Sequence, residues 1–272
     1  DLHSFPTRRS SDLEPVPAHN LRKIFTHNGT TGVTFTSCSN LNTTQQAELN
    51  TSSGGIVDNR CAQRLEWLRG NPKDEIRTTG GLKAFRNRPK TVMGDVVNSD
   101  PAYVKDVNYG YSGLATTPGQ DSYDTYRAAN GLRTPMVYVG ANDGHMYGIR
   151  GDAGATDSGV TKFSYIPQGV FSNLSHLTDP SYAHRYYVDG SITVGDAYLN
   201  GEWKTVLLGG LNAGGKSIYA LDVTDPENFD EKKVLWEFDA AIAAAKTGDT
   251  SDLGLTGSRS EERRVGKECR SR

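Results

Sequence analysis

VYVGANDGHMYGI, at residues 137–149, holds two short apolar runs separated by Asn-Asp-Gly. An Asp-Gly pair between apolar runs is the strongest short-range signal of a β-hairpin, because the turn needs backbone angles that glycine readily adopts. Residues 206–222, VLLGGLNAGGKSIYALD, repeat the order of apolar strand, glycine, turn and tyrosine-containing strand. Repetition of one small sheet unit is typical of the blades of a β-propeller.

Further short strands are predicted on both sides of this repeat. Asn200-Gly201 predicts a second hairpin, and no alternation of strands with long helices occurs, so we expect an all-β fold. Residues 106–134 are expected to form a long surface loop, and residues 239–246 one or two helical turns. The predicted strands are TVMGDVV (91–97), AYVK (102–105), FSYIP (163–167), YYVDG (186–190), ITVGDAYL (192–199) and VLWEFD (234–239).

Residues 14–90 are polar and lack a strand pattern, so we expect an irregular lead-in segment with a short helix. The helix is predicted at AQRLEWLR (62–69), where Leu65 and Leu68 lie on one face and Gly70 ends the helix. Residues 91–258 are then predicted to form an incomplete β-propeller that consists of its first blades.

The two ends of the chain, residues 1–13 and 259–272, show no hydrophobic periodicity. The DNA string AGATCGGAAGAGC encodes Arg-Ser-Glu-Glu, which stands at residues 259–262. Its reverse complement encodes Ser-Ser-Asp, which stands at residues 10–12. Both ends therefore look like one sequencing-library adapter translated from opposite strands, and we exclude them from fold reasoning as adapter-derived artefacts.

The remaining residues, 14–258, hold 22 Lys and Arg against 27 Asp and Glu. This mildly acidic balance argues against nucleic-acid binding. No apolar run is long enough to span a membrane. Cys38 and Cys61 are an even pair that favours a disulfide in a secreted protein, with two free buried thiols as the alternative.

The sequence resembles the PilC/PilY family of type IV pilus tip-associated proteins. The long stretch at 186–226 is the most specific in its order and spacing, and the resemblance covers residues 20–255. The matching stretches are RKIFT (22–26), RLEWLRG (64–70), GDVVNSDP (94–101), VYVGANDGHMYGI (137–149), YYVDGSITVGDAYLNGEWKTVLLGGLNAGGKSIYALDVTDP (186–226) and LWEF (235–238).

The resemblance implies a C-terminal domain shaped as a modified β-propeller, which acts in pilus assembly and in attachment to surfaces. It implies an extracytoplasmic location, at the pilus tip or the outer membrane, with pilin, minor pilins and a host or abiotic surface as partners. It also implies a calcium site with an EF-hand-like loop. No such loop pattern occurs here, so the calcium site is expected downstream of Ser258. We expect no enzyme activity, no catalytic residue and no cofactor in this stretch.

Two alternatives remain open on sequence. Arg150-Gly151-Asp152 spells a cell-attachment tripeptide after a predicted strand, whereas the plainer interpretation is a strand end followed by a turn glycine. Residues 137–149 also look like a repeat of quinoprotein dehydrogenases, which use pyrroloquinoline quinone. That enzyme would need a polar cofactor pocket with metal ligands, and residues 186–226 do not resemble it.

Overall fold

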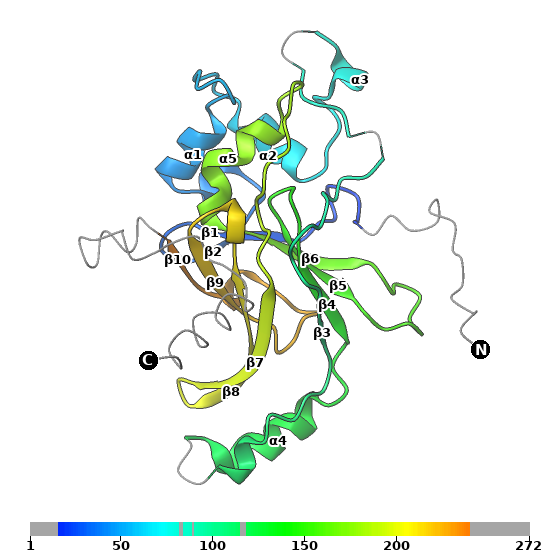
Figure 1. The fold of residues 1–272 in the computed structure, drawn as a ribbon, viewed down its shortest axis with the longest axis vertical. Helices are drawn as coiled ribbons and strands as arrows, with labels where there is room; N and C mark the ends of the chain where they lie inside the picture. The colour runs from blue at the N-terminus through cyan, green and yellow to red at the C-terminus, as the bar shows by residue number, and fades with distance from the viewer. Residues whose placement is uncertain (1–15, 82–83, 89, 115–117, 240–272) are drawn as a thin grey trace, which may run out of the picture.

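Two β-sheets form the centre of the computed structural model, which describes residues 16–81, 84–88, 90–114 and 118–239 (Figure 1). The predicted adapter-derived ends and the predicted helical turns after Asp239 lie outside the described residues. The strands are β1 (Ile24–His27), β2 (Gly32–Thr34), β3 (Ala102–Val104), β4 (Met136–Gly140), β5 (Met146–Arg150), β6 (Thr161–Ile166), β7 (Ile192–Leu199), β8 (Glu202–Gly210), β9 (Ser217–Asp222) and β10 (Val234–Asp239).

Each sheet contains one four-stranded antiparallel meander. The first sheet has the order β2-β1-β6-β5-β4-β3, and the second has the order β10-β9-β8-β7. The two repeated sequence stretches occupy the same place, because β4–β5 and β8–β9 are the middle strands of their meanders. Mainly β structure in two open sheets confirms the predicted fold class, an all-β incomplete propeller.

The lead-in segment contributes more structure than the sequence predicted. β1 pairs in parallel with β6, and β2 pairs with β1, so this segment widens the first sheet. Helix α2 confirms the predicted helix within one residue at each end. The helices are α1 (Thr43–Leu49), α2 (Cys61–Leu68), α3 (Ile76–Thr79), α4 (Gln120–Asn130) and α5 (Phe171–Leu177), and the 3-10 turns are η1 (Cys38–Asn40), η2 (Tyr111–Gly113), η3 (Gln168–Val170), η4 (Asn212–Gly214) and η5 (Glu231–Lys233). Helices α1, α2 and α5 gather above the sheets, and α4 lies below them (Figure 1).

Local turn chemistry explains the two predicted hairpins. Asn200 and Gly201 both have positive φ, 53° and 89°, and join β7 to β8. Between β4 and β5, Gly144 has a φ of 90°, and the Ala141 N–H donates to the His145 carbonyl. This second turn is therefore wider than a two-residue turn, although the hairpin itself is confirmed.

Three predictions about single segments are wrong. Residues 91–97 form no strand, because the Gly94 N–H donates to the side chain of Asp143 and Val96 and Val97 are exposed. Residues 186–190 form no strand either, because the Tyr187 N–H donates to the side chain of Asn142. The expected loop 106–134 contains α4, which packs aromatic rings against β8.

The two sheets pack against each other, with β1 near β10 and both β3 and β4 near β7. Phe163 of the first sheet stacks on Phe229 at 3.8 Å between ring centroids, and Tyr165 lies 5.1 Å from Tyr219 of the second sheet. Glu237 of β10 accepts hydrogen bonds from the Tyr165 hydroxyl and from the backbone N–H of Gln168 and Gly169. Burial raises the pKa of Glu237, although these donors favour its ionised form.

Candidate functional site

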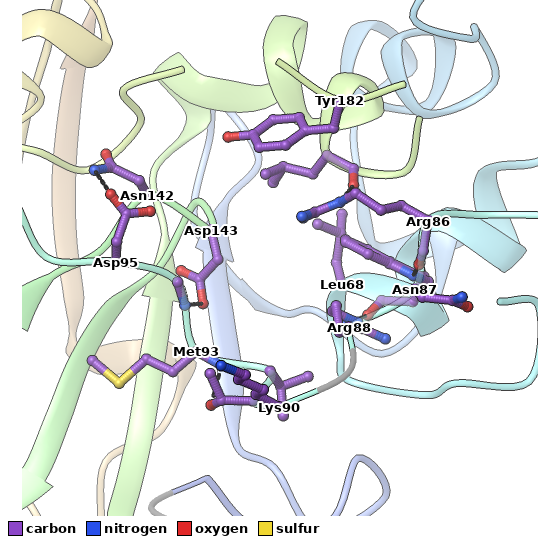
Figure 2. A pocket seen from close by; sticks show the side chains of 15 residues that line it. Leu68, Arg86, Asn87, Arg88, Lys90, Met93, Asp95, Asn142, Asp143 and Tyr182 are labelled. Atoms are coloured by element: carbon purple, nitrogen blue, oxygen red, sulfur yellow. Dashed lines mark hydrogen bonds between the residues drawn. The ribbon is translucent and has the colours of Figure 1, made fainter. Parts of the chain in front are cut away.

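A pocket of about 260 Å³ lies where the lead-in segment meets the β4–β5 turn (Figure 2). One wall comes from residues 91–95 and the turn, and the other from the end of α2, residues 86–88 and Lys90. Leu177 of α5 and Tyr182 complete the lining. Segments far apart in the chain therefore build this site together.

The acidic wall begins at Asp95. Its Oδ2 atom accepts hydrogen bonds from His184 Nε2 at 2.8 Å and from Asn142 Nδ2 at 3.2 Å. Partial burial opposes ionisation of Asp95, but these two donors outweigh it and lower the pKa of the carboxyl. Asp95 is therefore a carboxylate at neutral pH.

Asp143 stands beside it and leads into a buried polar network. Its Oδ2 accepts from the Gly94 N–H at 2.9 Å and from the Tyr147 hydroxyl at 2.5 Å, and its Oδ1 accepts from the His145 N–H. Burial raises the pKa of Asp143 against these hydrogen bonds, and it raises the pKa of Tyr147 as well. Arg22 donates to the Arg69 carbonyl at 2.8 Å, and its other terminal nitrogen lies 3.4 Å from the Tyr147 hydroxyl. The network therefore fixes the lead-in segment to the first sheet.

The opposite wall carries positive charge. Arg88 stacks over the Trp67 ring at 3.8 Å, and its Nε donates to Glu75 Oε1 at 2.8 Å. Arg86 lies over the Tyr182 ring at 4.3 Å, and its Nε donates to the Leu177 carbonyl at 2.9 Å. Figure 2 shows Arg86 reaching from this wall towards the middle of the pocket.

Side chains that could bind a metal ion or transfer a proton decide what chemistry is open to the part of the chain that the structure describes. No group of three or more His, Cys, Asp or Glu side chains suited to a metal ion occurs among those residues. His145 Nδ1 lies 3.1 Å from Ser164 Oγ, a nucleophile-and-base contact, but both residues are only 1% exposed. Burial also lowers the pKa of His145 well below its usual value. The pair is therefore buried in this structure.

A second polar cluster lies at the seam between the two meanders. Asp189, which is 1% exposed, accepts from the N–H and side-chain amide of Asn98 and from the side chain of Asn212. Two stretches that carry the family resemblance, 94–101 and 186–226, thus meet at one carboxylate. Two backbone segments approach closely at this seam, since a Cβ on Gly214 would lie 1.7 Å from the Tyr187 carbonyl oxygen.

The candidate residues from the sequence lie away from this pocket. Cys38 of η1 and Cys61 at the start of α2 are joined by a disulfide, with Cα atoms 6.3 Å apart. Arg150 ends β5, and its guanidinium contacts Asp152 at 3.4 Å, Asp157 at 3.1 Å and Glu227 at 3.2 Å. The tripeptide is thus held within an ion-pair cluster, and its role in attachment stays a prediction.

Sequence reasoning missed the pocket residues and the seam. Asp95 and Asp143 stand in stretches that carry the resemblance. The pattern that could have indicated them is a carboxyl beside a glycine inside an otherwise apolar motif. Arg86 and Tyr182 gave no sequence signal, because they lie in segments without periodicity and about 95 residues apart.

A chain that builds successive four-stranded antiparallel meanders, packed face against face, is a protein of the β-propeller class. Its pocket and seam are formed by the connections between the strands rather than by the strands. The PilY1 β-propeller domain matches residues 93–259 of this chain, and the chain belongs to that family.

Two curated relatives support this membership. The type IV pilus biogenesis factor PilY1 of Pseudomonas aeruginosa is 40% identical over 215 residues, which cover 77% of this chain and 17% of that protein. A PilY1 homolog from Xylella fastidiosa is 40% identical over 199 residues, covering 71% of this chain and 12% of that protein. The crystal structure of the P. aeruginosa PilY1 C-terminal domain is 40% identical, with a TM-score of 0.41 over 57% of this chain and 27% of that one. The chain thus spans less than a fifth of the curated relatives' length.

No helix among the described residues has the length and apolar character needed to cross a bilayer.

Proposed function

We propose that this chain supplies part of the β-propeller of a type IV pilus biogenesis factor, and that it acts as a non-catalytic scaffold. The observation that carries the proposal is the family match over residues 93–259, which begins in the pocket wall and includes the whole second meander. Relatives with this domain are named as pilus biogenesis factors. Pilin and minor pilins are the partners that follow from this role.

A scaffold role agrees with how the polar residues of the chain are used. The carboxyl groups of Asp143, Asp189 and Glu237 each accept hydrogen bonds from other segments of the same chain. Buried carboxylates satisfied in this way order a structure, whereas a catalytic group needs access to a substrate. The buried Ser164–His145 contact lacks that access.

The location proposed for the chain is extracytoplasmic, at the pilus tip or associated with the outer membrane. A disulfide between Cys38 and Cys61 fits an oxidising compartment. The calcium site expected from the family is proposed to lie downstream of Ser258, outside the described residues. No site in the described part of the chain is assigned to calcium.

A chimera tests the proposed function. The matching 215-residue stretch of the P. aeruginosa relative is replaced by the corresponding residues of this chain, and surface pili and twitching motility are measured in a strain that lacks its own copy. We expect the chimera to restore piliation. A matched chimera with Gly214→Ala should fail, because the seam cannot close. A folded, exported chimera that restores no pili would overturn the proposal.

Surface attachment is the finer part of the proposal. Asp152→Glu in the intact protein is expected to weaken binding to integrin-coated surfaces if the tripeptide takes part in attachment. The variant keeps the charge that faces Arg150, so the ion-pair cluster should persist. Unchanged binding would remove the tripeptide from the attachment role without affecting the role in pilus biogenesis.

The quinoprotein alternative rests on residues 137–149 alone. Titration with pyrroloquinoline quinone, followed by absorbance, separates the two functions. A saturable spectral change would favour the dehydrogenase.

A further inference from the structure

We propose that the pocket between the lead-in segment and the β4–β5 turn binds a carboxylate carried on a short apolar group, about the size of one amino-acid residue. This site stands independently of the proposed role in pilus biogenesis. Its size, its charge distribution and the state of Arg86 carry the inference.

The cationic group that would meet the ligand is Arg86. Its backbone N–H and Nε are engaged by the carbonyls of Thr178 and Leu177, and its guanidinium lies over the Tyr182 ring. No carboxylate pairs with Arg86 within the described ranges of the chain, and its terminal nitrogens remain for a ligand. A guanidinium held in this way presents a fixed fork that matches a carboxylate.

The neighbouring arginine shows the contrast. Arg88 is bound to Glu75, and it also donates to the Trp67 and Asn71 carbonyls. Its guanidinium is therefore already paired inside the protein, with a carboxylate that Arg77 also contacts. Lys90, which is exposed on the same wall, has no carboxylate partner among the residues that the structure describes. The surplus positive charge of this wall belongs to Arg86 and Lys90.

The remaining lining decides the kind of anion. Leu68, Val92, Met93 and Leu177 offer apolar surface to a short aliphatic group. Asp95 and Asp143 stand on the far wall, and the negative charge of Asp95 would repel a doubly charged phosphate more strongly than a single carboxylate. A monoanion can place its carboxylate at Arg86 and its apolar part against Val92 and Leu177. It then pairs with the positive wall and adds only one negative charge near Asp95.

Two sources share this chemistry, namely the C-terminus of a peptide and a free small acid. The test uses the intact protein and calorimetric titration with four probes: N-acetyl-leucine, N-acetyl-leucinamide, inorganic phosphate, and a hexapeptide that ends in leucine. We expect N-acetyl-leucine to bind at least about tenfold more tightly than its amide, because the charged hydrogen bonds to Arg86 are lost in the amide. Phosphate should bind more weakly than N-acetyl-leucine. A hexapeptide that binds as tightly as N-acetyl-leucine assigns the site to peptide C-termini, and a weaker hexapeptide assigns it to free acids.

Variants assign the binding to this pocket. Arg86→Gln should weaken N-acetyl-leucine binding about tenfold or more, and Lys90→Gln should weaken it severalfold. Lys232→Gln, which changes an exposed lysine of the η5 turn before β10, is the matched control and should leave the affinity unchanged. Because Arg86 also contacts the backbone, its variant is checked by thermal unfolding, and Lys90→Gln carries the test if that variant is unfolded.

Equal affinity for the acid and the amide would overturn the proposal. Absence of saturable binding would overturn it as well. So would a combination of two results: Lys90→Gln binds N-acetyl-leucine as tightly as Lys232→Gln, and a folded Arg86→Gln protein binds it as tightly as wild type.

Discussion

Arg64 places a guanidinium in the interior of the lead-in segment, where its side chain is only 3% exposed. Two hydrogen bonds, at 2.7 and 2.6 Å, join it to the two carboxylate oxygens of Asp58, and a third reaches the Leu49 carbonyl. A buried charge that loses its partner is costly because neither water nor another carboxylate replaces it. The hydrogen bond from Arg64 lowers the pKa of Asp58.

Asp58→Asn is therefore expected to lower the free energy of unfolding by about 2 kcal/mol, less than for a fully buried pair because Asp58 is partly exposed. Asp124→Asn on the exposed side of α4 is the control and should change it by less than about 0.5 kcal/mol. Urea unfolding of the intact protein measures both. Equal effects would show that the Arg64 contact contributes nothing.

The same contact sets a pH dependence. The folded-state pKa of Asp58 is below its unfolded value, so its contribution is present above the unfolded pKa, about 4. The contribution is lost as the pH falls through the lower, folded-state pKa. The stability difference between wild type and Asp58→Asn should therefore shrink below about pH 4. A difference that stays constant down to pH 2 would contradict this assignment.

Gly214 allows the chain to close the seam between the meanders. Gly214→Ala would place a methyl group on the Tyr187 carbonyl, so we expect a loss of about 3 kcal/mol or an insoluble protein. Gly195→Ala in β7 has open space around the new methyl group and serves as the control. Soluble yield and thermal unfolding distinguish them. A stable Gly214→Ala protein would mean that the seam is looser than the structure has it.

At the scale of elements, the disulfide between Cys38 and Cys61 joins η1 to the first turn of α2. The two cysteines are 23 positions apart in the chain, and closing such a loop in the unfolded state is worth about 3 kcal/mol in loop-entropy estimates. One of the two joined elements, α2, also carries Trp67 and Leu68 of the pocket.

Replacing Cys38 and Cys61 together by serine is expected to lower the stability by about 3 kcal/mol. Non-reducing peptide mapping of the natural protein should find the two cysteines in one cross-linked fragment. Full alkylation of both thiols without reductant would show that the bond is not formed in the cell.

The sequence predicted those elements whose structure depends on the residues of the element itself. Asn200-Gly201 and the Asp-Gly turn after Asn142 set hairpins through the backbone angles of their own residues. Residues 91–97 and 186–190 look like strands, but their hydrogen bonds go to side chains far along the chain, at Asp143 and Asn142. The pocket could not be predicted because it also depends on contacts between distant segments. The sequence of one wall does not indicate which segment forms the opposite wall.

At the scale of the whole molecule, one face of the second sheet exposes two large apolar side chains, Leu208 and Trp236. Thr193, Leu208, Ala220 and Trp236 are cross-strand neighbours in one row, and Leu208 and Trp236 are 40% and 45% exposed. Cross-strand neighbours lie on the same face of a sheet. Blades of a propeller cover such faces with the next blade.

Residues 14–258 expressed alone are therefore expected to aggregate or to unfold without a sharp transition. Replacing Leu208 and Trp236 together by lysine should increase the monomeric fraction in size-exclusion chromatography. The same double change in the longer protein should instead impair folding, because the face is then needed for packing. A monomeric, sharply unfolding fragment without these changes would contradict the proposed face.

The parallel pairing of β1 with β6 places Ile24 beside Ser164, about 140 positions later in the chain. Contacts so distant along the chain form slowly, because a long loop must close before they contribute any stability. During synthesis β1 therefore keeps one edge unpaired until β6, the last strand of the first meander, has been made. The refolding rate should accordingly be limited by chain topology. The unpaired edge of β1 is the part of the folding chain that a chaperone would most need to cover.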